Sequence, residues 1–221
     1  MKVNRQIVQE MNLEELFDII RKLLVVNNTF IRCAALRLIK YLCTNETITE
    51  LMFSFKLNVF IIMSLERSDK LPQERNSALA LLSFLIENFT HLIPRSIILS
   101  ILCVANDSTD PLRTACLKLV LQLMIHIPEK VVFCDGVQVL LNGCVETCNC
   151  SLLQSSVLAC LYYLNDYRFR QKKTILDLQI VLDPLLIESK SLPPDKQSEL
   201  QVSRYMSNLV LLTILRTWTG L

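Results

Sequence analysis

The sequence predicts an all-α protein built from stacked helical repeats, and three observations lead to this prediction. Apolar residues recur at steps of three and four along the chain, which is the period of a helix with one buried face. The 221 residues are 52% hydrophobic but include only 3 glycines, which disfavours turn-rich β architectures. One helical pattern also returns at intervals of about 40 residues, as it does in solenoids of helical units.

The clearest copy of this pattern is DPLRTACLKLVLQLMI at 110–125. Asp110 is expected to cap the helix, because its carboxylate can accept hydrogen bonds from the first-turn N–H groups. Pro111 fits the first turn, where a missing N–H group costs nothing. The predicted polar strip is short: Arg113, Thr114, Lys118 and Gln122. A helix with so little polar surface must be covered on several sides, so we expect an inner helix with Leu117 at its centre.

Three copies of the pattern align in register. Each begins with an arginine: Arg32, Arg75 and Arg113. Each has a small residue two positions later (Ala34, Ser77 and Ala115) and a leucine four positions later (Leu36, Leu79 and Leu117). A weaker copy at 154–158 keeps the small residue and the leucine but lacks the arginine. This spacing is typical of armadillo and HEAT repeats, so we expect an armadillo/HEAT-like, right-handed helical-repeat solenoid.

The predicted elements make a single helical-repeat domain over residues 1–221. The inner helices of the repeats are expected near 29–43, 72–88, 110–125 and 151–164. An amphipathic helix precedes them at 13–26, and an outer helix is expected at about 48–67. A further helix, opened by Pro94, is expected through 97–104. A helix after Pro128 is expected to break at Asp135-Gly136, because both residues favour turns. A polar linker at 188–197, containing Pro193-Pro194, leads to a terminal helix at 198–219.

The arginines Arg32, Arg75 and Arg113 form a candidate column between repeats. Each falls near the start of a helix, where the macrodipole disfavours a cation. An acidic side chain in an adjoining turn can offset this cost, and the candidates are Asp69, Asp107 and Asp110. We expect a structural role, because every repeat needs its turn fixed against the next one. The alternative is a ladder of arginines that binds an acidic ligand.

Composition and charge exclude several classes of protein. The formal net charge is only +2 with both signs interspersed, so no basic stripe points to nucleic acid. No apolar run approaches the roughly 18–20 residues of a transmembrane segment. The N-terminus lacks the apolar core of a secretory signal, so we expect a soluble, cytoplasmic protein.

Nine cysteines without a signal peptide argue against a disulfide framework, because the count is odd. Cys144, Cys148 and Cys150 are the candidate metal group, but they lack a C-x-x-C pair and have no histidine near them. We therefore expect reduced thiols and no bound metal. Small buried thiols that pack between helices explain the cysteines.

No catalytic motif is present in the sequence. The two histidines, His91 and His126, are isolated, and the sequence contains no Gly-rich phosphate loop, H-E-x-x-H or G-x-S-x-G. No candidate cofactor site follows from the remaining residues. The chain is therefore expected to be a binding module and not an enzyme.

Several segments carry a more specific resemblance. These are IRCAALRLIKYL at 31–42, ERNSALALLSFLI at 74–86, LRTACLKLVLQL at 112–123, GVQVLLNGCVE at 136–146, LYYLNDYRFRQ at 161–171 and ILRTWTGL at 214–221. Their order and spacing resemble the N-terminal armadillo-like region of the Rictor family, the rapamycin-insensitive companions of the TOR kinase. One departure is Asp135, which precedes Gly136 where the family tends to have a Gly-Gly pair.

The resemblance implies a non-catalytic scaffold subunit of TOR complex 2, the assembly that phosphorylates AGC-family kinases such as Akt. The implied partners are the TOR kinase and other subunits of that complex. Rictor-like proteins continue beyond the motif at Trp218, so a fragment, a truncated product or an incomplete gene model is expected. The alternative function is an unrelated armadillo/HEAT adaptor that binds extended peptides, although the spaced Trp and Asn residues of importin-like adaptors are absent.

The terminal helix is the candidate exposed interface, through Leu211, Leu215 and Trp218. Apolar residues occur there at neighbouring positions, and they cannot all face one preceding repeat. Exposed apolar patches mark interfaces or aggregation sites. We therefore expect the isolated chain to self-associate.

Overall fold

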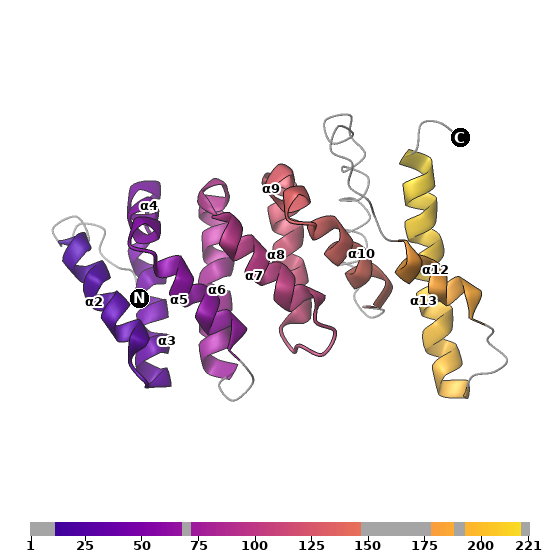
Figure 1. The fold of residues 1–221 in the computed structure, drawn as a ribbon, viewed down its shortest axis with the longest axis horizontal. Coiled ribbons are helices and arrows are strands. Elements are labelled where there is room, and N and C mark those ends of the chain that lie inside the picture. Colours follow the sequence, from indigo (N-terminus) through magenta and orange to yellow (C-terminus); the bar gives the residue numbers. More distant parts are fainter. Residues whose placement is uncertain (1–11, 68–71, 147–177, 188–192, 218–221) are drawn as a thin grey trace. The chain divides into compact units, whose positions relative to one another are not determined.

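The computed structural model describes residues 12–67, 72–146, 178–187 and 193–217. Every regular element in these residues is a helix, which confirms the prediction of an all-α protein (Figure 1). The chain divides into two compact units, Met1–Ser100 and Ile101–Leu221.

The first unit contains helices α2 to α6 and a short 3-10 helix, η1. Their bounds are α2 Leu13–Val25, α3 Thr29–Leu42, α4 Glu46–Ser54, α5 Leu57–Glu66, α6 Pro72–Phe89 and η1 Thr90–Leu92. Helices α3 and α6 lie side by side, and α2 and α5 pack against them respectively (Figure 1). Helix α7, Arg95–Asn106, begins in this unit and ends in the second.

Asparagine side chains cap the N-termini of three of these helices. The Oδ1 atom of Asn28 accepts hydrogen bonds from the N–H groups of Phe30 and Ile31, at 2.9 and 3.3 Å. Asn12 and Asn45 cap α2 and α4 in the same way. Each cap satisfies a first-turn N–H group that has no partner within its helix.

The predicted outer helix at 48–67 is two helices, α4 and α5, which are bent by 78° relative to each other. Lys56 lies between them in the left-handed conformation, with φ 59°. The bend lets Phe55 approach Phe17 of α2, with a distance of 6.0 Å between ring centroids, while Leu57 and Ile61 are fully buried. Packing on both sides of the bend therefore outweighs the cost of the left-handed residue.

Among the described residues, no single helix is long and apolar enough to cross a membrane. Helices α4 and α5 reach that length and apolar composition only when both are counted together across their bend.

The described residues of the second unit form the end of α7 and helices α8, α9, α10, α12 and α13. Their bounds are α8 Arg113–His126, α9 Pro128–Phe133, α10 Gly136–Glu146, α12 Gln179–Leu186 and α13 Pro194–Thr217. Helix α10 packs against α8, α9, α12 and α13. The predicted inner helix at 151–164 lies outside the described residues.

Helix α8 begins at Arg113, two residues later than an N-cap at Asp110 predicts. The Oδ1 atom of Asp110 instead accepts a hydrogen bond from the N–H group of Leu112, at 2.8 Å, within the turn before the helix. Arg113 was expected on the polar strip but is buried, with 7% exposure. Lys118 is exposed and Leu117 is fully buried, as the helical period predicts.

The small residue that packs in each inner helix lies one position later than the alignment predicted. Ala35, Ala78 and Cys116 are buried. By contrast, Ala34 is exposed, whereas Ser77 and Ala115 are half-buried. The buried residues lie three positions after each arginine, so they share its helix face, and this face is buried. Leu79, which was aligned with two fully buried leucines, is only half-buried.

The predicted break at Asp135-Gly136 is confirmed. Helix α9 ends at Phe133, Asp135 has a φ of 58°, and α10 begins at Gly136. A Cβ atom on Gly136 would lie 2.4 Å from Cγ1 of Val131 and 3.0 Å from its carbonyl oxygen. Glycine at 136 thus permits the close approach of α9 and α10.

The terminal helix, which was predicted at 198–219, already begins at Pro194, inside the predicted linker at 188–197. Proline suits this position, since its fixed φ matches a helix and its missing N–H group would be unpaired there anyway. Residues 188–192 lie outside the described residues.

Candidate functional site

The centre of the first unit contains a buried ion pair between Arg32 of α3 and Glu74 of α6. Nε of Arg32 lies 2.9 Å from both carboxylate oxygens of Glu74, and Nη2 lies 2.6 Å from Oε2. The two residues are 3% and 1% exposed. This bidentate geometry is the strong form of an arginine–carboxylate interaction.

Two residues of the α5 segment complete the environment of Glu74. The Oγ atom of Ser64 donates a hydrogen bond to Oε1 at 2.9 Å, and Nη1 of Arg67 lies 3.3 Å from both oxygens. Burial by itself raises the pKa of Glu74. The hydrogen bonds from Arg32 and Ser64 and the charges of Arg32 and Arg67 lower this pKa by a larger amount, so the pKa lies below its ordinary value. One carboxylate thus joins helix α6 to α3 and to the end of α5.

Each arginine of the predicted column donates to a carbonyl group at the end of the preceding helix. Nη1 of Arg32 lies 2.7 Å from the carbonyl oxygen of Val26, just after α2. Nε of Arg75 lies 2.9 Å from the carbonyl oxygen of Leu65 in α5. Nε of Arg113 lies 3.2 Å from the carbonyl oxygen of Ala105 in α7. These carbonyls lack partners within their own helices, and their helix ends attract cations.

A fourth arginine, which the sequence did not single out, makes the same type of contact. Arg204 of α13 donates from Nε to the carbonyl oxygen of Pro184 at 3.0 Å, and from Nη2 to that of Ile187, at the end of α12. Its segment lacks the aligned small residue and leucine, so the repeat pattern gave no signal for it. Glu74 was also missed, because a glutamate in a first helical turn is ordinarily a solvent-exposed partner of the helix dipole.

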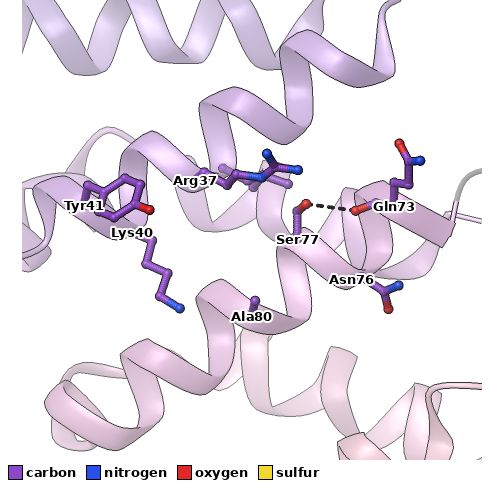
Figure 2. A pocket seen from close by; sticks show the side chains of 8 residues that line it. Arg37, Lys40, Tyr41, Gln73, Asn76, Ser77 and Ala80 are labelled. Atoms are coloured by element: carbon purple, nitrogen blue, oxygen red, sulfur yellow. Dashed lines mark hydrogen bonds between the residues drawn. The ribbon is translucent and has the colours of Figure 1, made fainter. Parts of the chain in front are cut away.

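A groove runs along the exposed sides of α3 and α6 in the first unit, with a volume of about 490 Å³. Arg37, Lys40 and Tyr41 extend from α3, and Gln73, Asn76, Ser77 and Ala80 extend from α6 (Figure 2). Leu36 forms its buried floor. None of the described residues that line it is acidic. The groove therefore combines two cations with polar side chains.

The candidate interface on α13 is only partly within the described residues. Leu215 is 46% exposed and its neighbour Leu212 is 51% exposed, whereas Leu211 is half-buried. Trp218 lies outside the described residues, as do Cys148 and Cys150 and the side chain of Cys144. Elsewhere in the described chain, no three histidine, cysteine or acidic side chains are grouped as metal ligands.

Comparison with known protein families gives one match over the whole chain. A family model described as "Rapamycin-insensitive companion of mTOR, N-term" matches residues 1–221.

Similar curated proteins include pianissimo A of Dictyostelium discoideum, which is 24% identical over 94% of this chain and 19% of its own length. The rapamycin-insensitive companion of mTOR of Mus musculus is 23% identical over 95% of this chain and 13% of its own length. The target of rapamycin complex 2 subunit TSC11 of Saccharomyces cerevisiae is 27% identical over 63% of this chain and 10% of its own length. The chain thus spans less than one fifth of the length of each of these relatives.

Proposed function

Because this chain belongs to the family of N-terminal regions of the rapamycin-insensitive companion of mTOR, we propose that it acts as a non-catalytic scaffold of target of rapamycin complex 2. The observation that carries the proposal is the family match over residues 1–221. The yeast relative is named as a subunit of target of rapamycin complex 2, which supports the same assembly. An unrelated armadillo or HEAT adaptor, the alternative from the sequence, does not agree with the family match.

The internal contacts of the two units support a scaffolding role. The most buried charged groups, Arg32 and Glu74, bind each other between helices. Arg75, Arg113 and Arg204 donate to carbonyl groups at helix ends. We assign this set of arginines to holding successive helices in register, in preference to binding an acidic ligand.

The architecture that we propose for the chain is a single right-handed armadillo/HEAT-like solenoid. The repeat spacing of about 40 residues and the recurring contact between an inner-helix arginine and the preceding helix support it. Its proposed location is the cytoplasm. Its proposed partners are the TOR kinase and other subunits of the complex.

Affinity purification of the tagged chain from its own cells tests the function. We expect the TOR kinase to be recovered with the chain, and not with a matched Leu117→Asp variant. That variant places a charge at a fully buried position of α8 and should unfold the protein. Recovery of other proteins without the TOR kinase, from cells in which the tagged chain is folded and abundant, would contradict the proposal.

A further inference from the structure

We propose that the groove between α3 and α6 binds an extended, acidic segment of a protein partner. The groove is lined by Arg37, Lys40 and Tyr41 of α3 and by Gln73, Asn76 and Ser77 of α6 (Figure 2). This site is separate from the buried ion pair of Arg32 and Glu74. The inference also does not depend on the proposed role in target of rapamycin complex 2.

The charges of the groove are available to a ligand. Arg37 is exposed and forms no hydrogen bond or ion pair with any other described residue. Nζ of Lys40 lies 5.6 Å from the centroid of the Phe84 ring, a contact that positions the ammonium group without neutralising its charge. Acidic groups of a partner would therefore meet two cations that have no carboxylate among the described lining residues.

The spacing of the two cations fits an extended chain. Arg37 and Lys40 are three residues apart in one helix, so they lie on the same face with Cβ atoms about 5–6 Å apart. In an extended peptide, alternate side chains point to the same side and are about 7 Å apart. Two acidic residues at positions i and i+2 of a peptide can therefore pair with Arg37 and Lys40 together.

The opposite wall of the groove favours a peptide over a simple anion. The exposed side chains of Gln73 and Asn76 each carry an amide that both donates and accepts hydrogen bonds. A peptide backbone offers both N–H and C=O groups to such amides, whereas a phosphate ion at neutral pH chiefly accepts. From Gln73 to Ala80 the helix rises about 10 Å, which matches three or so residues of an extended peptide.

The hydroxyl of Ser77 already donates to the carbonyl oxygen of Gln73, at 2.9 Å (Figure 2). The two side-chain amides, and not this hydroxyl, are therefore the donors that we assign to the peptide backbone.

Fluorescence anisotropy with the whole chain tests the proposal. The probe is a labelled 12-residue peptide of alternating glutamate and serine, and the reference is the same peptide with lysine in place of glutamate. We expect saturable binding of the glutamate peptide that weakens as salt is raised, because exposed ion pairs are screened. We expect at least tenfold weaker binding of the lysine peptide.

Peptide binding by variants of the groove is compared with binding by the parent chain. The double substitution Arg37→Glu/Lys40→Glu should weaken binding of the glutamate peptide at least tenfold and should strengthen binding of the lysine peptide. Lys118→Glu is the matched control, because Lys118 is exposed at the position of α8 that aligns with Arg37; its effect should stay within about twofold. The gain of lysine-peptide binding also shows that the double variant is folded.

Two further probes separate the peptide from other anions. A single-stranded RNA oligonucleotide or inorganic phosphate that displaces the glutamate peptide at an equal or lower concentration of negative charge would overturn the proposal. Equal binding by the parent and the double variant would also overturn it. Failure of these titrations would leave the recovery of the TOR kinase unaffected, so the two proposals are tested independently.

Discussion

The guanidinium group of Arg32 and the carboxylate of Glu74 form a bidentate ion pair between α3 and α6, at residues 42 positions apart in the chain. Both side chains are almost completely buried. A buried ion pair often adds little net stability compared with apolar residues, because removing two charges from water is costly. Its clearer consequence is specificity, since either charge left alone in this position is strongly unfavourable.

Replacing Glu74 with alanine should lower the free energy of unfolding by about 3–5 kcal/mol, because Arg32 would remain buried without its counter-ion. The double variant Arg32→Met/Glu74→Met should recover part of this loss. Asp18→Ala is the control, since Asp18 forms exposed ion pairs with Arg21 and Lys22, and its loss should cost about 1 kcal/mol or less. Urea denaturation measures all three; equal losses for Glu74→Ala and Asp18→Ala would contradict the burial of the pair.

The same pair should make stability depend on pH in the acidic range. The pKa of Glu74 is lowered in the folded protein from its ordinary value of 4.5, so unfolding takes up a proton in the window between the two values. Its contribution is therefore complete above about pH 4.5 and is lost as the pH falls through the lower, folded pKa. The difference in stability between the parent and Glu74→Gln should shrink below pH 4.5 and stay constant from pH 5 to 7. Denaturation curves at several pH values measure this difference. A stability difference between the parent and Glu74→Gln that grows on acidification would contradict a lowered pKa of Glu74.

Leu117 and Gly143 should be coupled in the second unit. Leu117→Ala is expected to cost about 2–5 kcal/mol, because it leaves a cavity at a fully buried position. Lys118→Ala, on the exposed side of the same helix, should stay within about 0.5 kcal/mol. A Cβ atom on Gly143 would lie 2.8 and 2.9 Å from the two Cδ atoms of Leu117.

Gly143→Ala alone should therefore cost about 1–3 kcal/mol through overpacking. In the Leu117→Ala background the added methyl group enters vacated space, so the same substitution should cost less. Thermal or urea denaturation of the double-mutant cycle measures this coupling. Additive effects would show that the two positions do not pack against each other.

The cysteines should differ widely in reactivity. Cys103 is exposed, whereas Cys33, Cys43, Cys116 and Cys134 are buried. Burial raises the pKa of the Cys43 thiol to about 11, despite a hydrogen bond with Thr49 that lowers it. Among these five, iodoacetamide at pH 8 should modify Cys103 first and Cys43 very slowly, because the thiolate is the reactive form. Peptide mapping by mass spectrometry follows both sites, with urea-unfolded protein as the control; equal rates in the folded protein would be inconsistent with this burial.

The exposed leucines of α13 should promote self-association of the purified chain. Leu212 and Leu215 are about half exposed and lie three residues apart, so they share one face of the helix. Leu212→Lys/Leu215→Lys should shift the chain toward monomer in sedimentation velocity, and Leu211→Lys and Trp218→Lys test the two remaining residues of the predicted interface. Gln201→Lys, at an exposed position earlier in α13, is the matched control. A parent chain that stays monomeric at high concentration, and does not bind a hydrophobic dye, would refute the prediction.

Local patterns in the sequence were sufficient for the all-α fold class and for the recurrence of Arg32, Arg75 and Arg113. The helical period placed Leu117 on the buried face, and the turn preference of Asp135-Gly136 placed the break between α9 and α10. These features depend on interactions between neighbours in the chain, which the order of residues displays directly.

The sequence alone did not reveal what the arginines bind, nor which small residue packs beside them. The alignment chose Ala34 where Ala35 is buried, and no pattern paired Arg32 with Glu74. The bend at Lys56 was likewise missed, since an apolar run predicts one continuous helix. Such features depend on how helices distant in the chain pack together: a buried charge is stable only where a particular neighbour supplies its partner, and only the tertiary structure brings Glu74 to Arg32.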